Sequence, residues 1–403
     1  MIVHFEPASE EGIATVVRAM ATERASLAVI GGGTRSGLGN PVRADRVLST
    51  RRLSGIVSYN PAEMTVSALA GTPLAEVEAA LAENRQMLSF EPMDHRPIFA
   101  TTGEPTIGGV FAANVSGPRR IVAGAARDSL LGVRFVNGRG DAIKAGGRVM
   151  KNVTGLDLVK LLAGSHGTLG ILTEVTFRVL PKPPASETVV VSGLNDAEAA
   201  AVMAEAMAQT VEVSGAAHLA ESVRGRFIGG GLPDGAATVL RLEGLQASVS
   251  IRAEKLSKAL ERFGAVSRLD AEQTATLWSE IRDVKPYADG SDRPLWRVSV
   301  APSAGHQLVA ALRLQTGVDA FYDWQGGLVW LRMEADPEAA LVRRYIKALG
   351  SGHATLVRAS DGFRATIPSF EPQPAPVALL SERVREKFDP QRIFNPGRMQ
   401  AVS

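Results

Sequence analysis

The sequence predicts an α+β protein built from two different domains. At 403 residues the chain is long enough for two to three domains of about 150 residues each. Its first half places glycine-rich segments between strand-like runs. Between about residues 188 and 358, the order strand, helix, strand, strand, helix, strand occurs twice. Two such units side by side predict an antiparallel sheet covered by helices on one face.

The composition excludes several function classes. Hydrophobic residues make up 45% and charged residues 21%, which is typical of a globular protein. The net charge is +2 and the basic residues are dispersed, so nucleic-acid binding is not indicated. There is no cysteine, which excludes disulfides, thiolate catalysis, and cysteine-ligated zinc or iron–sulfur clusters within this chain. With neither a signal peptide nor an apolar run of about 18 residues visible, we expect a cytoplasmic protein.

Local patterns place the elements of the first half. Apolar residues recur at helical spacing from Ser9 to about Thr22. Thr72 followed by Pro73 predicts the start of a second helix, with Thr72 as its N-cap. Asn137-Gly138 predicts a β-hairpin. We expect strands at 27–30, 46–49, 63–69, 131–136, 142–144 and 171–179, and the second helix at 72–84.

The duplicated region and the C-terminal tail follow. The first unit is expected to have strands at 188–192, 215–219, 238–243 and 265–268 and helices at 196–209 and 248–262. The second is expected to have strands at 296–300, 320–324, 328–334 and 354–357 and helices at 303–314 and 337–349. A proline-rich strip at 368–376 should be extended and separate two pieces of structure. The helix expected at 377–388 and the tail after it are too short for a domain and must dock on the rest.

The first motif with chemical meaning is Gly31-Gly-Gly-Thr-Arg-Ser-Gly-Leu-Gly39, directly after a strand. Glycines allow backbone N–H groups to converge on a phosphate. A P-loop is excluded because the required lysine is missing. A Rossmann fingerprint is excluded because Pro41 and a further strand follow in place of a helix. A phosphate-binding loop between two strands and a plain glycine-rich turn remain as interpretations.

Three further segments carry related patterns. In residues 101–117, Thr106 can cap a short helix that ends near Asn114, and the N–H groups freed at its start could face a phosphate. The Gly108-Gly109 pair of that helix could equally serve close packing. Residues 164–174 form a glycine-spaced loop that leads into a strand, which could also be only a tight turn. The fourth segment is the tail Phe394-Asn-Pro-Gly-Arg-Met399.

Taken in this order, the four segments resemble the vanillyl-alcohol oxidase or PCMH-type FAD-binding flavoproteins, and among these the FAD-binding subunits of bacterial glycolate oxidases. The resemblance covers about residues 27–180 and 388–399. It implies a PCMH-type FAD-binding domain of two α+β subdomains at 1–182. It also implies an α+β cap of duplicated ferredoxin-like units at 183–370, and a tail at 371–403 that returns to the FAD domain.

The resemblance also implies which residues contact FAD. The first loop would hold the pyrophosphate through backbone amides, the second segment would line the diphosphate and the flavin, the third would give backbone contacts, and the tail would lie beside the flavin ring. These residues are Gly31, Gly32, Gly33, Thr34, Arg35, Ser36, Leu38 and Gly39; Pro105, Thr106, Ile107, Gly108, Gly109, Asn114 and Gly117; Gly167, Gly170 and Ile171; and Asn395.

Departures from the family pattern sharpen the expected function. The first loop lacks the histidine that attaches FAD covalently in some members, so we expect non-covalent FAD. The six histidines show no metal-ligand spacing, and only His166 lies in an expected cofactor loop. We expect no metal site, and no catalytic base is identified.

The resemblance implies an FAD-dependent redox subunit that supports oxidation of glycolate, a 2-hydroxy acid. Electrons would pass through the flavin to a partner, and the implied partners are a larger flavoprotein subunit and an iron–sulfur subunit, with at most peripheral membrane association. The alternatives are a self-contained FAD-dependent oxidase or dehydrogenase of another small hydroxy acid or alcohol, and a binding module without cofactor.

Overall fold

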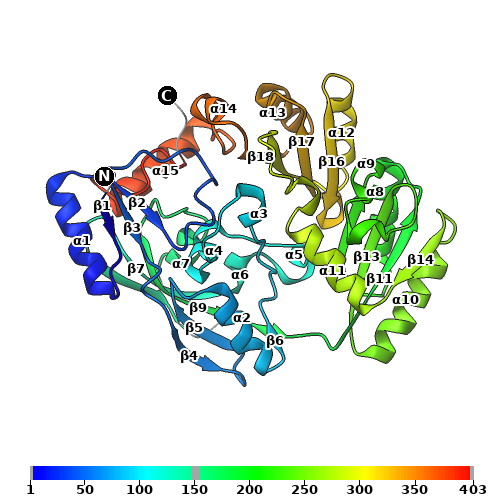
Figure 1. Cartoon of the computed structure of the whole chain (residues 1–403), viewed down its shortest axis with the longest axis horizontal. Coiled ribbons are helices and arrows are strands. Elements are labelled where there is room, and N and C mark those ends of the chain that lie inside the picture. Colours follow the sequence, from blue (N-terminus) through cyan, green and yellow to red (C-terminus); the bar gives the residue numbers. More distant parts are fainter. Residues whose placement is uncertain (1–2, 148–154, 400–403) are drawn as a thin grey trace.

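The computed structural model describes residues 3–147 and 155–399 (Figure 1). The first sheet is parallel, with strand order β1-β3-β2. Its strands are β1 (Val3–Phe5), β2 (Leu27–Ile30) and β3 (Arg46–Ser49). Helix α1 (Glu10–Glu23) begins where the Ser9 side chain accepts a hydrogen bond from the Gly12 amide, and its buried face packs on this sheet. The glycine-rich segment therefore lies between two strands, as expected.

A five-stranded antiparallel sheet follows, in the order β4-β5-β9-β7-β8. Its strands are β4 (Ile56–Asn60), β5 (Thr65–Leu69), β7 (Leu130–Val136), β8 (Ala142–Gly146) and β9 (Ile171–Arg178). Helices α2 (Leu74–Glu83), α4 (Ile107–Ala113) and α7 (Leu158–Leu162) contribute to the core beneath it. The short elements are β6 (Gln86–Met87), β10 (Leu180–Pro181), α3 (Arg96–Phe99), α5 (Arg120–Ala123) and α6 (Ala126–Ser129).

Two local expectations are corrected in this region. The N-cap of α2 is Pro73, not Thr72. The Thr72 hydroxyl donates to the carbonyls of Leu69 and Gly55 instead, and therefore fixes the turn before the helix. The β7–β8 hairpin is confirmed, but it has a longer loop than a two-residue turn. Asn137 accepts hydrogen bonds from the amides of Arg139 and Asp141 there.

The duplicated region forms one eight-stranded antiparallel sheet, in the order β14-β11-β13-β12-β16-β17-β15-β18. Its strands are β11 (Ala185–Ser192), β12 (Val213–Leu219), β13 (Ala237–Gly244), β14 (Val266–Leu269), β15 (Leu295–Val300), β16 (Val318–Asp323), β17 (Leu328–Met333) and β18 (Gly352–Arg358). The two units join where β12 pairs with β16. Both predicted strand–helix orders are confirmed.

Four helices cover one face of this sheet, as predicted. They are α8 (Asp196–Ala208), α10 (Gln246–Leu260), α12 (Gly305–Arg313) and α13 (Ala339–Ala348). Helix α11 (Ala271–Arg282), which the sequence analysis missed, lies on the opposite face of the first unit, so that β11 and β13 stand between α10 and α11 (Figure 1). The small elements are α9 (Glu221–Arg224), η1 (Ile228–Gly230), η2 (Lys285–Tyr287) and η3 (Trp324–Gly326).

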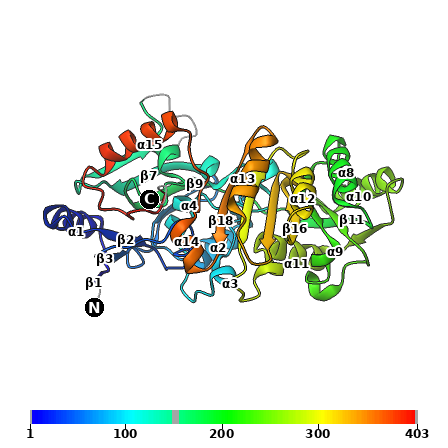
Figure 2. The ribbon, with the colours of Figure 1, turned by 90° about the horizontal axis from the view of Figure 1, so that it is seen from above.

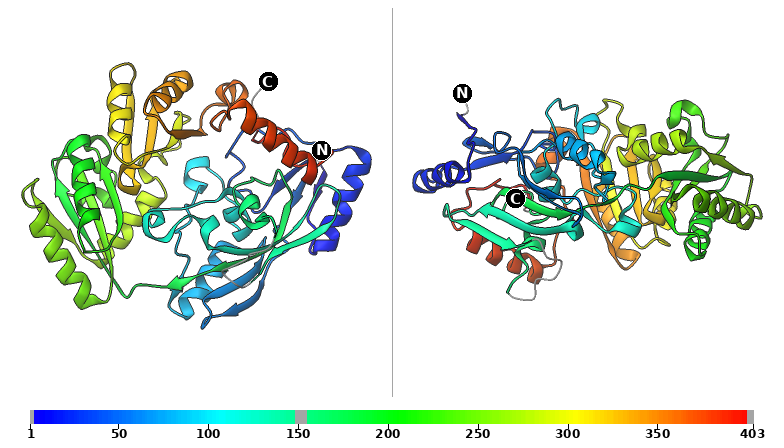
Figure 3. Two further views of the ribbon diagram at one scale, coloured as in Figure 1. Left: turned by 180° about the vertical axis from the view of Figure 1, so that it is seen from behind. Right: turned by 90° about the horizontal axis from the view of Figure 1, so that it is seen from below.

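The C-terminal segment returns to the first half of the chain. After α14 (Asp361–Thr366), helix α15 (Ala375–Phe388) lies beside the five-stranded sheet, where Phe388 contacts Phe135 of β7 (Figures 2 and 3). The following residues pair with β2: Leu27 donates its amide to Ile393 and accepts from the Asn395 amide. The expected docking of the tail is confirmed. The proline-rich strip is shorter than expected, because α15 begins at Ala375.

One hydrophobic cluster runs through both halves of the molecule. It contains Phe111 and Phe177 of the first half as well as Val190 and Phe321 of the eight-stranded sheet. Burial of this shared apolar surface holds the two halves against each other. Within the described ranges, no helix is long and apolar enough to cross a membrane.

Candidate functional site

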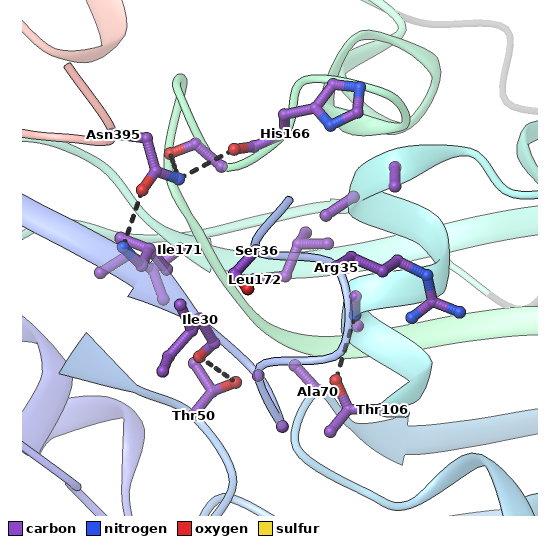
Figure 4. A pocket seen from close by; sticks show the side chains of 18 of the residues that line it. Ile30, Arg35, Ser36, Thr50, Ala70, Thr106, His166, Ile171, Leu172 and Asn395 are labelled. Atoms are coloured by element: carbon purple, nitrogen blue, oxygen red, sulfur yellow. Dashed lines mark hydrogen bonds between the residues drawn. The ribbon is translucent and has the colours of Figure 1, made fainter. Parts of the chain in front are cut away.

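A pocket opens where the parallel sheet, the start of α4 and the loop before β9 meet (Figure 4). Thirteen of the sequence-predicted site residues line it: Gly31, Gly32, Gly33, Thr34, Arg35, Ser36, Thr106, Gly108, Gly109, Gly167, Gly170, Ile171 and Asn395. The structure thus brings residues from all four predicted segments to one cavity.

The glycine loop lies backbone to backbone against residues 103–106. A Cβ at Gly32 would lie 1.8 Å from the Glu104 carbonyl oxygen, and one at Gly31 would lie 2.3 Å from the Thr106 hydroxyl. At Gly33 the situation differs, because its backbone has φ +79 and a Cβ there would meet no atom within 4 Å. Glycine at 31 and 32 therefore permits the close packing of the loop, while Gly33 borders the open cavity.

The carbonyl groups at the end of this loop are held by arginines from distant parts of the chain. Arg398 donates to the carbonyls of Ser36 and Leu38 at 3.0 and 2.6 Å. Arg364 donates to the carbonyls of Gly37 and Gly39 at 2.7 and 2.8 Å. This clamp fixes the backbone orientation of the loop, so its shape depends on α14 and the tail.

The amides of the same loop remain free. The N–H groups from Gly32 to Ser36 donate no hydrogen bond to any residue within 3–147 or 155–399. Unpaired backbone amides beside a cavity need an acceptor, and successive amides in a glycine-rich turn form a nest for anionic oxygens. The loop therefore has the donor set that a pyrophosphate requires.

The backbone amides at the start of α4 differ from the expectation that they are free. Thr106 caps it as predicted and accepts from the Gly109 amide at 3.3 Å. The amides of Ile107 and Gly108 donate to the carbonyls of Thr72 and Ala70. The expectation that freed N–H groups at this helix start face a phosphate is therefore wrong, because the neighbouring backbone already uses them.

The cationic side chain of Arg35 lies close to this helix start. Its Nη1 atom lies 3.5 Å from the position that a Gly109 Cβ would take, and its one hydrogen bond within the described residues runs to the Met93 carbonyl at 3.3 Å. Burial lowers the pKa of Arg35 to about 10, so the guanidinium stays charged at neutral pH. A positive group with spare donors beside free amides favours a negatively charged ligand.

Asn395 ties the tail to the pocket. Its side-chain oxygen accepts from the Val29 amide at 2.8 Å, and its amide group donates to the carbonyls of His166 and Gly167 at 2.9 and 3.3 Å (Figure 4). The residue is 1% exposed. Three chain segments that form separate walls of the pocket are therefore joined through one side chain.

His166 lies at the rim of the pocket and packs against Phe370, with ring centroids 4.9 Å apart. Burial and the nearby Arg398 guanidinium lower the pKa of His166 to about 4, so the ring is neutral at pH 7. Its surroundings make it a neutral wall group. No group of three or more metal-ligating side chains occurs in the part of the chain that the structure describes.

Six predicted site residues do not line the cavity: Leu38, Gly39, Pro105, Ile107, Asn114 and Gly117. They shape it from behind. The Leu38 carbonyl binds Arg398, Asn114 caps α4 and accepts from the Arg127 amide, and the Gly117 carbonyl accepts from the Trp324 indole. The close packing proposed for the glycine pair applies to Gly108, whose Cβ would lie 2.6 Å from Ala70.

Ten residues that were not predicted also line the pocket: Val29, Ile30, Thr50, Ala70, Ala112, Ala113, Ser165, His166, Leu172 and Arg398. Six of them lie inside the predicted motifs: Ala112, Ala113, Ser165, His166, Leu172 and Arg398. Among these six, only His166 and Arg398 have an ionisable side chain, and the other eight lining residues are small or apolar with no local signature of ligand contact.

The geometry and the comparisons agree on the class of protein. Residues 2–146 match the FAD binding domain family. With the free amides of the glycine loop, this match defines the chain as an FAD-binding flavoprotein. Over 386 residues the chain is 32% identical to the glycolate oxidase subunit GlcE of Escherichia coli strain K12, and the alignment covers 94% of each chain. The chain belongs to the GlcE family.

Other similarities agree with this assignment. The chain is 36% identical over 189 residues to D-2-hydroxyglutarate dehydrogenase of Xanthomonas citri pv. viticola, which covers 46% of this chain and 38% of that protein. The solved structure of p-cresol methylhydroxylase superimposes with a TM-score of 0.72 at 17% identity, over 99% of this chain and 88% of that one. This likeness shows the fold alone. The predicted fold class and family resemblance are confirmed.

Proposed function

We propose that the pocket binds FAD without a covalent bond. The observation that carries this proposal is the row of free amides from Gly32 to Ser36, beside the charged Arg35. These groups would hold the pyrophosphate, and the small residues Gly109, Ala112 and Ala113 leave room for a flat ring. Among residues 31–39 there is no histidine to form a covalent link. Asn395 would hold the walls of the pocket at the correct separation.

We further propose that residues 1–182 and 371–403 form the cofactor-binding domain, and residues 183–370 the cap. The described contacts support this division. Arg398 and Asn395 reach the glycine loop and β2. By contrast, residues 185–358 complete their own eight-stranded sheet.

The function that this site supports best is that of an FAD-dependent redox subunit of a glycolate-oxidising complex. When bound, FAD accepts a hydride and can pass electrons on singly. The proposal rests on the similarity to a glycolate oxidase subunit and to dehydrogenases of D-2-hydroxyglutarate and D-lactate. The word subunit in the name of GlcE supports a hetero-oligomer. From the family resemblance we propose that a larger flavoprotein and an iron–sulfur protein receive the electrons, and the absence of cysteine means that this chain itself holds no cysteine-ligated cluster.

A self-contained dehydrogenase of a small hydroxy acid remains the second candidate. The observation that favours it is a pair of arginines between the two halves of the molecule, Arg120 and Arg297, whose guanidinium groups form no hydrogen bond within residues 3–147 and 155–399. Such groups could bind a substrate without help from a partner.

The test begins with purified chain. FAD released on denaturation, at about one per chain, is expected; a colourless protein that takes up no FAD would overturn both candidates. The flavin of the isolated chain is then mixed anaerobically with glycolate. We expect it to stay oxidised alone and to be reduced in the copurified complex. Rapid reduction in the isolated chain would favour the self-contained dehydrogenase instead.

A further inference from the structure

The two units of the eight-stranded sheet differ on the face that lies opposite their helices. In the first unit this face is apolar, with Val190, Ala217 and Val239 buried. Helix α11 covers it, and the Trp278 indole donates to the Thr188 hydroxyl at 3.0 Å. This half of the face is therefore closed by packing.

In the second unit the same face is apolar at Phe321, Trp330 and Val357, but part of it, on the outer strands β15 and β18, is polar. Trp296 and Val298 of β15 point to the helix side, where they belong to the cluster beneath α12 and α13. The alternate residues Arg297 and Ser299 therefore lie on the other face, paired in register with Thr355 and His353 of β18. All four are partly or fully exposed to solvent. A sheet face of this kind forms one wall of a polar site.

Two guanidinium groups beside this wall contact the same aromatic ring. Arg297 lies over the Trp324 ring with its Cζ atom 4.8 Å from the centroid, and Arg120 of α5 lies over the same ring at 4.7 Å. Neither makes a hydrogen bond or an ion pair with any residue in 3–147 or 155–399. The indole orients both cations and leaves all their N–H groups without acceptors.

The neighbouring arginines in the same region differ, because they bind carboxylate groups. Arg119 pairs with Glu243, and Arg241 binds Glu91 through two hydrogen bonds of 2.8 and 3.0 Å. Burial and the nearby Arg120 guanidinium lower the pKa of Arg297 to about 10, and the Asp323 carboxyl opposes this shift. Both groups remain charged at neutral pH, so a bound anion near them would offset their mutual repulsion.

This wall adjoins the cofactor pocket. The amide of Leu356 in β18 donates to the Ser369 carbonyl at 2.7 Å, and the next residue, Phe370, packs on His166 at the pocket rim. On the other side, Arg35 and Arg297 both lie close enough to His95 to lower its pKa. Helices α3 and α5 stand between the sheets of the first half and the eight-stranded sheet (Figures 1 and 3).

We propose that Arg297 and Arg120 bind the carboxylate of a small organic acid at the seam between the two halves, next to the cofactor pocket. This inference rests on the proposed function, because it takes the cofactor pocket as the site of flavin. A planar guanidinium group can form two parallel hydrogen bonds with one carboxylate. Its contact with the Trp324 ring leaves the N–H groups accessible for these bonds. The ligand is a monocarboxylic or short dicarboxylic acid, and a free acidic side chain of a partner protein is the competing occupant.

The test measures binding separately from turnover. FAD-loaded full-length chain is titrated with glycolate and with oxalate, by calorimetry and by the change in the flavin spectrum, with neutral glycolamide as the control ligand. The variants are Arg297→Gln, Arg120→Gln and Arg297→Lys. Arg344→Gln is the matched control, because Arg344 is an exposed arginine that also lies over an aromatic ring, that of Tyr345.

We expect saturable binding of both acids and none of glycolamide. Each glutamine variant should weaken binding about tenfold or more, Arg297→Lys should restore part of it, and Arg344→Gln should not change it. Flavin content reports the proposed function independently: loss of FAD overturns that function, whereas full FAD content without acid binding overturns only this inference. Glutamine variants that bind the acids normally, or that lose only a copurifying protein, would also overturn it.

Discussion

Substitution of Gly33 should separate cofactor binding from folding. A Cβ at this position meets no protein atom within 4 Å, and Gly33 lines the cavity beside the free amides. In Gly33→Leu the added side chain should therefore enter the space that the pyrophosphate needs. The substitution strains the backbone of the protein only at this residue, because a residue other than glycine at φ +79 costs about 1–2 kcal/mol.

The expected loss of affinity follows from the number of contacts displaced. Each hydrogen bond to a charged oxygen contributes about 1.5–3 kcal/mol, so loss of one weakens FAD binding by about tenfold to a hundredfold. Titration of apoprotein with FAD, followed by flavin fluorescence, measures this change. Thermal denaturation of the apoprotein should show a decrease of only a few degrees.

Gly350→Leu is the matched control, because Gly350 has φ +90, no atom within 4 Å of its Cβ position, and no place in the pocket. It should lose similar stability and keep normal FAD affinity. Normal affinity in Gly33→Leu would refute the placement of the pyrophosphate at this loop. Equal loss of affinity in both variants would show that backbone strain alone is responsible.

Two further predictions concern buried polar groups. Asn395→Ala leaves the Val29 amide and two carbonyls without their partner. We expect the unfolding free energy, measured by denaturant titration, to decrease by about 3 kcal/mol and FAD binding to weaken. A decrease below about 1 kcal/mol would contradict this role of Asn395. Burial and Arg35 lower the pKa of His95 to about 3 in the folded state. The unfolded state therefore binds more protons than the folded state between about pH 3 and about pH 6.5, and acid destabilises the fold. Unfolding free energy should decrease by up to about 1.4 kcal/mol per pH unit through this group as pH falls, and an unchanged pH slope in His95→Gln would contradict it.

Local residue patterns are sufficient to predict the framework of the site. The glycine loop between two strands, the Thr106 cap and the duplicated strand–helix order all follow from patterns of a few neighbouring residues. Such patterns act through the backbone of the same segment, and for that reason they can be predicted without a fold. The order of the four motifs along the chain was enough to indicate the family.

Which groups remain free to bind a ligand depends on contacts between segments that are far apart in the chain. The amides of Ile107 and Gly108 had looked available, but backbone carbonyls of another segment accept them. Helix α11 was missed, and whether it covers one half of the sheet face cannot be read from a local pattern. Arg120 and Arg297 look like ordinary surface arginines in the sequence, whereas the fold places both over Trp324, where neither forms a salt bridge within residues 3–147 and 155–399. Hydrogen-bond satisfaction depends on partners far apart in the chain, and therefore the fold, not the local sequence, decides which donors face the pocket.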